Sequence, residues 1–256
     1  MNILFLGDIV GKSGREIIRD LLPSLKEKFK SDFVIANGEN ATHGKGLTLN
    51  IYEELISYGI DAITMGNHTY SKHNIIENIS KMGRLIVPNN FIDKVGSGYR
   101  LFEINKRKVC VANILGRYSM GDYMSDPYES YQDIIDHVRA DIFIVDMHAE
   151  ATAEKRLFAE YFKSHAQCVL GTHTHVQTAD EAVLNNKTAF ISDVGMCGPY
   201  DSIIGRDINE TIRSNILHEK TRYEIAEGQA ILCGVSVTID DNSCLPVSIE
   251  RIQIRP

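Results

Sequence analysis

Polar side chains able to bind metal recur along this chain, nearly all directly after a short apolar run. The runs are rich in β-branched residues and bounded by turn-forming residues, which predicts strands. Carboxylates, amides and imidazoles together form the mixed oxygen and nitrogen ligand set of Mn, Fe or Zn, whereas Mg and Ca prefer oxygen alone. The residues of this kind at the run ends are Asp8, Glu39, Asn40, Asn67, His68, His148, His173 and His175.

The elements that position these residues alternate in type. Residues 15–30 and 50–59 carry apolar side chains three and four positions apart, which predicts helices between the early strands. Strands alternating with helices indicate βαβ units and a mainly parallel sheet, at least in the first half of the chain. Ligands of such sheets bind beyond the carboxyl ends of the strands. We therefore expect the polar residues to converge on one rim.

The C-terminal stretch 230–254 has a different pattern. Two alternating apolar segments flank the turn sequence DDNS with no helix between them, which predicts an antiparallel hairpin. No linker-like composition, internal repeat or low-complexity segment interrupts the chain. We expect one α/β domain that spans residues 1–256.

The N-terminal sequence GDIVGKS resembles a phosphate-binding P-loop but is one residue too short. Asp8 would also repel a phosphate unless a cation lay between them. Asp8 could therefore cap the following helix or anchor a metal ion. Further along the chain, His173 and His175 are two positions apart. In an extended segment both imidazoles would point the same way, into one site.

Each candidate also has a purely structural interpretation. Glu39 and Asn40 could be turn residues, and His148 could be a buried histidine with satisfied hydrogen bonds. Separate accidents would then have to place every one of these side chains at a strand end. A joint site is the simpler explanation, because convergent polar groups in a cleft are typical of binding sites.

Composition restricts the classes of partner. The 256 residues carry a formal net charge of −7, so we expect no surface that grips an extended nucleic acid. Five scattered cysteines without a C-x-x-C pair argue against a disulfide framework or a zinc ribbon, and suit a reducing cytoplasm. No apolar run has the length of a membrane span. We expect a cytoplasmic protein and a homo-oligomer, because small parallel-sheet enzymes often form symmetric assemblies.

Four motifs resemble a known group of enzymes. GNH at 66–68 followed by GTHTH at 171–175 is similar to the calcineurin-like metallophosphoesterase superfamily, which usually also carries D-x-H and G-D-x-x-D. Here Val10 replaces the histidine of the first motif, and NGEN replaces the second. These departures, with NGENATHGKG at 37–46 and SDVGMCGPYDSIIG at 192–205, resemble the YmdB-type phosphodiesterase branch. The resemblance implies a four-layer α/β/β/α sandwich with two divalent transition metal ions, Fe, Mn or Zn.

The resemblance also implies a role for each matching residue. Asp8, Glu39, Asn40 and His175 would hold one metal, and Glu39, Asn67, His148 and His173 the other, with Glu39 as the bridge. A hydroxide shared by the metals would attack a small phosphodiester, a 2′,3′-cyclic nucleotide in particular. His68 would donate a proton to the leaving oxygen, or else only orient a ligand.

Weaker candidates and other functions remain open at this point. His43, Lys45 and Arg117 are weaker candidates for substrate contacts, because solvated loop residues would look the same. Asp193 could orient an imidazole or cap a turn. A phosphomonoesterase or nucleotide pyrophosphatase could use the same metal core. A regulatory protein that binds nucleotide or RNA with little turnover would also fit.

Overall fold

The first sheet places the N-terminal strand next to the last part of the chain. A computed structural model describes residues 1–72, 74–121 and 123–256. The strand order is β2-β12-β13-β1-β3-β4-β5, and β14 pairs with β13. These strands are β1 (Asn2–Leu6), β2 (Asp8–Ile9), β3 (Phe33–Asn37), β4 (Ala62–Thr64), β5 (Leu85–Ile86), β12 (Met196–Pro199), β13 (Ala230–Ile239) and β14 (Pro246–Ile254). Strands β1, β3, β4 and β5 run parallel, as predicted, while β13 is antiparallel to β1.

The second sheet is built from the middle of the chain. Its order is β10-β11-β9-β8-β7-β6, and the pairs from β7 through β8 and β9 to β11 are parallel. The strands are β6 (Tyr99–Ile104), β7 (Arg107–Leu115), β8 (Ile142–His148), β9 (Cys168–Thr172), β10 (Ala182–Leu184) and β11 (Thr188–Ile191). Glu39 and Asn67 follow strands of the first sheet, whereas His148 and His173 lie at strand ends of the second.

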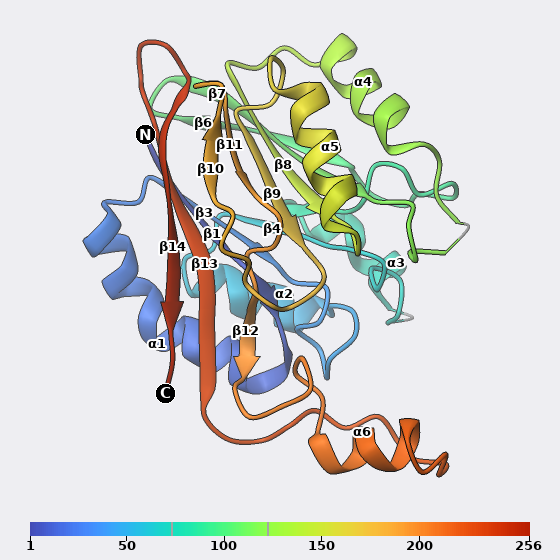
Figure 1. Ribbon diagram of the computed structural model, residues 1–256. Helices are drawn as coiled ribbons and strands as arrows, with labels where there is room; N and C mark the ends of the chain where they lie inside the picture. The colour runs from blue at the N-terminus through green and yellow to red at the C-terminus, as the bar shows by residue number, and fades with distance from the viewer. Residues whose placement is uncertain (73, 122) are drawn as a thin grey trace.

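Helices cover the outer face of each sheet, so the molecule has the four α/β/β/α layers that were predicted (Figure 1). The first sheet is covered by α1 (Gly11–Phe29), α2 (Leu49–Ser57), the short α3 (Ile75–Asn78) and the 3-10 turn η1 (Ile79–Lys81). The second sheet is covered by α4 (Pro127–His137) and α5 (Thr152–Phe162). Helix α6 (Ile208–Asn215) covers neither sheet and projects at the lower end of Figure 1.

Strand β1 shows why the sheets stack. Ile3 and Phe5 point into the core between the two sheets, while Leu4 and Leu6 pack against the α1 side. Both faces of β1 are thus buried, which explains an apolar run that does not alternate with polar residues. The hydrophobic effect acts on both faces at once and fixes the sheet between its two neighbours.

The predicted terminal elements are confirmed. Strands β13 and β14 form the antiparallel hairpin expected from residues 230–254. Helix α1 begins at Gly11, and its N-cap residue is Val10 rather than Asp8. Asp8 lies within β2 and is therefore available for another role. Among the described residues no helix is long and apolar enough to cross a membrane.

Gly171 gives a test of the packing at the end of β9. A Cβ at this position would overlap the carbonyl of Ser192 and approach Cδ of Lys155 to 2.8 Å. We expect Gly171→Ala to lower the free energy of unfolding by about 1 to 3 kcal/mol, because neither neighbour can move freely. Urea denaturation measures this loss. Gly83→Ala is the matched control, because its Cβ would meet nothing within 4 Å; equal stability of the two variants would contradict the prediction.

Candidate metal centre and active site

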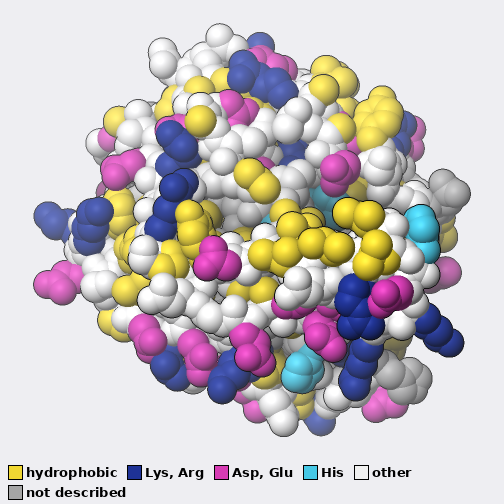
Figure 2. Space-filling view, turned by 60° about the horizontal axis from the view of Figure 1, so that its bottom comes forward, with side chains coloured by type: hydrophobic (Ala, Val, Ile, Leu, Met, Phe, Trp, Pro, Cys, Tyr) yellow, Lys and Arg dark blue, Asp and Glu magenta, His cyan; other side chains and the backbone are white. Residues whose placement is uncertain are grey.

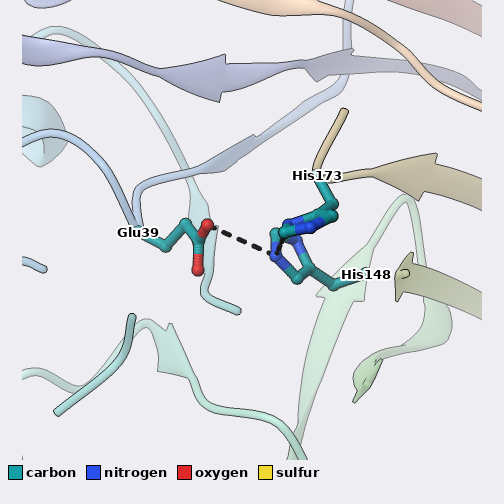
Figure 3. A group of neighbouring side chains, drawn as sticks. All are labelled: Glu39, His148 and His173. Carbon is teal, nitrogen blue, oxygen red and sulfur yellow. Dashed lines mark hydrogen bonds and ion pairs between the residues drawn. The ribbon is translucent and has the colours of Figure 1, made fainter. Parts of the chain in front are cut away.

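Three side chains from both sheets point toward one another at the rim. One ligand atom from each of Glu39, His148 and His173 lies within 4.8 Å of the other two (Figure 3). Nε2 of His148 is 3.3 Å from Oε1 of Glu39 and 3.1 Å from Nδ1 of His173. Oδ1 of Asn67 lies 3.1 Å from the same Nε2. One N–H cannot satisfy three acceptors, so this arrangement suits a cation.

The far side of the His148 ring is fixed by a buried network. Nδ1 of His148 lies 2.8 Å from Oγ1 of Thr172, whose hydroxyl donates to Asp146 at 2.5 Å. Asp146 also accepts hydrogen bonds from Thr64 at 2.5 Å and from Asn37 at 3.0 Å. Because the Thr172 hydroxyl donates its hydrogen bond to Asp146, its oxygen is left to accept a hydrogen bond from Nδ1–H of His148. This leaves the Nε2 lone pair directed at the cluster, as in metal sites where an outer partner sets the tautomer.

A second group lies beside the first. Asp8 is fully buried, and its Oδ2 accepts from the backbone N–H of His173 at 3.2 Å. Its Oδ1 is also buried and receives no hydrogen bond from any residue that the structure describes. Nε2 of His175 is 3.7 Å from this oxygen. An unpartnered buried carboxylate oxygen is costly unless a cation compensates it, which is the observation that best fits a metal here.

Asn40 connects the two groups. Its Nδ2 lies 3.1 Å from Nε2 of His175 and 3.1 Å from Oε1 of Glu39. The two ends of a carboxamide are exchanged by a half-turn about its terminal bond, so Oδ1 can take the same position. The side chain can therefore offer an oxygen to a cation between Asp8 and His175.

The extended conformation predicted for His173 and His175 is wrong, although both side chains do lie at the rim. Strand β9 ends at Thr172, and the backbone of His173 and His175 has φ of 106° and 65°. These left-handed values are uncommon outside glycine and often mark functional sites. The imidazoles reach the rim through a strained turn, not through strand alternation.

A buried ion pair holds this turn. Thr174, between the two histidines, donates its N–H to Oδ2 of Asp193 at 2.9 Å. Nζ of Lys155 lies 2.9 Å from the same oxygen, and both side chains are fully buried. Asp193 also accepts from the N–H of Gly195. It therefore caps the turn that follows it, one of the two roles open from the sequence, and fixes the backbone between the histidines.

The outer nitrogens of both histidines have partners as well. Nε2 of His173 is 3.1 Å from Oε2 of Glu150, and Nδ1 of His175 donates to the carbonyl of Ile204 at 2.8 Å. Each contact leaves the other ring nitrogen free to face the cluster. Both imidazoles thus present one free ring nitrogen to the cluster.

Burial and charge together set the protonation of the cluster. Burial raises the pKa of the Asp8 carboxyl to about 7. Burial alone would lower the pKa of His148, but the Glu39 carboxylate beside it overrides this and raises that pKa. The same contact lowers the pKa of Glu39 against the effect of burial. A proton on His148 thus balances Glu39, and a metal ion would displace it.

The GNH sequence combines close approach with two polar groups. A Cβ on Gly66 would overlap both Oε2 of Glu39 and Nε2 of His148, so only glycine fits there. Asn67 then contacts His148, and the backbone N–H of His68 donates to Oε2 of Glu39 at 3.0 Å. The His68 ring lines the cavity over the cluster, and burial lowers its pKa.

The cavity beside the cluster has a volume of about 420 Å³. Lys45 is among the residues that line it, whereas His43 and Arg117 are not. His43 is exposed, with φ of 51°. The guanidinium of Arg117 pairs with Asp126 at 2.7 Å. Of the three weaker substrate candidates, the structure brings only Lys45 to the site.

Several residues that shape the site were missed from the sequence. Asp146 interrupts the apolar run IFIVDMH, and that break was a usable signal. Glu150 lies two positions after His148. Lys155 sits in an ordinary helical pattern, and nothing in the sequence marks it as buried.

The donor set fits divalent transition metals, with carboxylate, amide and imidazole groups facing one another in two adjoining groups. A four-layer sandwich that carries such a set at its strand ends defines a calcineurin-like metallophosphoesterase. The model of the YmdB-like protein family matches residues 4–252. The chain belongs to this family.

Individual relatives agree with the assignment. A 2′,3′-cyclic-nucleotide 2′-phosphodiesterase of Bacillus subtilis is 44% identical over 99% of this chain and 97% of its own length. A structure described as a novel phosphatase from Mycoplasma pneumoniae has a TM-score of 0.94 at 38% identity, covering 99% of this chain and 93% of that one. A hypothetical protein from Thermus thermophilus has a TM-score of 0.93 at 31% identity, covering 99% of each chain.

The Lys155–Asp193 pair can be tested through stability. Lys155→Met leaves the Asp193 carboxylate buried without its counter-charge, so we expect the free energy of unfolding to fall by about 3 to 5 kcal/mol. Lys163→Met is the control, because Lys163 pairs with Glu160 on the surface of the same region and should change stability by less than about 1 kcal/mol. Guanidinium denaturation measures both variants. A Lys155→Met protein as stable as the control would show that the pair does not support the turn.

Proposed function

We propose that this protein is a metal-dependent phosphodiesterase with two metal ions, acting on small phosphodiesters and on 2′,3′-cyclic nucleotides in particular. The observation that carries the proposal is the pair of adjoining ligand groups that share Glu39. The unpartnered oxygen of Asp8 supports a cation in one group, and the crowding around Nε2 of His148 supports one in the other. The name of the Bacillus subtilis relative supports the substrate class.

In this proposal Glu39 would be shared by the two metal ions. Its Oε1 lies 3.1 Å from the Asn40 amide of one group and 3.3 Å from Nε2 of His148 in the other. Asp8, Asn40 and His175 complete the first ligand set, and Asn67, His148 and His173 complete the second. Fe and Mn suit these ligands best, and Zn also fits; metal availability decides occupancy among such ions.

The residues around the metals would divide the remaining work. Two divalent cations in these positions would lower the pKa of an attacking water and neutralise the phosphoryl oxygens. His68 has its ring in the cavity and its backbone tied to Glu39, so it is placed to give a proton to the leaving oxygen. Lys45, on the cavity wall, adds positive charge for an anionic substrate.

The proposal includes a cellular setting. All five cysteines are free, which supports the cytoplasm, where thiols stay reduced. The net charge of −7 favours a small substrate over an extended nucleic acid. We also propose a homo-oligomer, because small parallel-sheet enzymes often form symmetric assemblies.

The direct test is hydrolysis by protein reconstituted with Mn²⁺. Bis(p-nitrophenyl) phosphate, p-nitrophenyl phosphate and 2′,3′-cyclic AMP are compared, each with and without a chelator. We expect chelator-sensitive turnover of the two diesters and little of the monoester. Preference for the monoester would favour a phosphatase, and tight nucleotide binding without turnover would favour a regulatory protein.

Glu39→Gln tests the bridging role. Loss of the shared negative charge should weaken both sites, so we expect a lower metal content and a fall in kcat/KM of more than about 100-fold. Mass spectrometry of the bound metals and kinetics with bis(p-nitrophenyl) phosphate measure the two effects. Glu53→Gln, on the exposed side of α2, is the control and should match the wild type. Full activity in Glu39→Gln would rule out the mechanism.

His68→Ala separates proton donation from metal binding. The variant should keep its metals and lose about 10²- to 10⁴-fold in kcat for 2′,3′-cyclic AMP, whose alkoxide leaving group needs a proton. The loss should be much smaller for bis(p-nitrophenyl) phosphate, because nitrophenolate leaves without one. His137→Ala, at the exposed end of α4, is the control. Equal losses for both leaving groups would argue against a proton donor.

A further inference from the structure

The cavity extends well beyond the metal ligands. One end is formed by the cluster residues and His68, and the other by the segment around Ile204, helix α6 and Tyr223. Figure 2, with the lower end of Figure 1 turned toward the viewer, shows hydrophobic side chains gathered beside histidine and Lys or Arg side chains. The residues of this α6 end are Ile203, Ile204, Arg206, Thr211, Asn215 and Tyr223.

The α6 end offers little positive charge to a phosphate. The guanidinium of Arg206 makes two hydrogen bonds to Glu210, at 2.5 and 2.7 Å, and lies 5.1 Å from the centre of the Tyr223 ring. This pairing balances the charge of Arg206 and uses two of its five N–H donors, so Arg206 anchors α6 against Tyr223. Lys45 lies over the same ring from the neighbouring loop, close enough to His68 to contribute to lowering the pKa of that residue. Among the described residues at the α6 end, Arg206 is thus paired with a carboxylate, and Ile203, Ile204, Thr211, Asn215 and Tyr223 carry no charge. The α6 end therefore suits an uncharged group.

The apolar part of this end is tied to the metal ligands. Ile203 and Ile204 are 45% and 52% exposed and line the cavity. Ile204 has φ of 48°, a strained value for a β-branched residue, and its carbonyl accepts from His175. That hydrogen bond fixes how far the two isoleucines lie from the cluster.

Asn215 adds a polar group on the α6 side. Its Nδ2 donates to the carbonyl of Thr211 at 3.1 Å, which orients the amide. No group that the structure describes donates to its Oδ1, so this oxygen can accept from a ligand. An apolar surface with one oriented amide is typical of pockets that hold a flat, polar-edged molecule.

We propose that the α6 end of the cavity binds the nucleoside of a 2′,3′-cyclic nucleotide, with the base against Ile203 and Ile204 and its edge near Asn215. The inference rests on the proposed function. Both ester oxygens of a cyclic nucleotide belong to one ribose, so a leaving oxygen that faces His68 places the nucleoside on that side. His68 and the residues of the α6 end line the same cavity.

A second pocket provides the competing location. It has a volume of about 300 Å³ and adjoins Asn67 on another side of the cluster. Phe91 and Tyr123 stack there at 5.6 Å, a surface on which a base could also stack. His68 does not line this pocket. A base there would put the ribose away from the proposed proton donor.

The test compares a substrate that has a nucleoside with one that does not. KM and kcat are measured for 2′,3′-cyclic AMP and methyl p-nitrophenyl phosphate, using the Mn²⁺ protein and the variants Ile203→Ser and Asn215→Ala. We expect KM for cyclic AMP to rise about tenfold in each, with less than about a twofold change in kcat/KM for the small diester. Ser214→Ala, on α6 but outside the cavity lining, is the control and should change neither. Tyr123→Ala probes the aromatic pocket.

The outcomes separate the subsite from the function. Unchanged KM for cyclic AMP in both α6 variants, in a wild type that hydrolyses both substrates, would overturn the subsite. A rise in KM confined to Tyr123→Ala would place the base in the aromatic pocket and also overturn it. Equal losses for both substrates would do the same, because a nucleoside contact cannot affect methyl p-nitrophenyl phosphate. A wild type inactive on both substrates would instead refute the proposed function.

Discussion

Much of the structure around the site serves to hold several lone pairs close to Nε2 of His148. Glu39, Asn67 and His173 each bring an acceptor within 3.3 Å of that nitrogen, in a place that water barely reaches. Without a positive charge such a group of atoms repels itself. Without a metal, a proton on His148 provides one positive charge. A divalent metal ion would provide two.

Holding such an arrangement requires rigid support from several directions. The two sheets meet at the rim, so the side chains of the cluster come from strand ends that are fixed by cores on both faces. Behind them, Asp146 orients His148 through Thr172, and Lys155 with Asp193 holds the backbone between His173 and His175. These contacts keep the side chains of the cluster in position, so that binding of a ligand does not have to order them.

Sequence alone predicted those parts that follow from strand polarity. Asp8, Glu39 and His148 each end an apolar run, and the carboxyl ends of parallel strands share an edge. That reasoning could not predict the backbone conformation of His173 and His175, because left-handed φ values depend on contacts such as Thr174 with Asp193. Nor could it show that Lys155 is buried, since a helical lysine is usually solvated. Arg117 shows that a position at a strand end does not by itself place a side chain in the site. It was a candidate for substrate contact, but its guanidinium pairs with Asp126 instead.

The pairing of β1 with β13 has a consequence for biosynthesis. Asn2 pairs with Thr238, and the amino group of Met1 reaches the carbonyl of Ile239, 238 positions away. Asp8 lies on β2, which pairs with β12, and β12 in turn pairs with β13. The first strand therefore stays without one of its neighbours until residue 239 has left the ribosome, and the surroundings of Asp8 are incomplete before then. A nascent chain stalled before β13 would thus contain Asp8 and Glu39 without the sheet that holds them in their final positions.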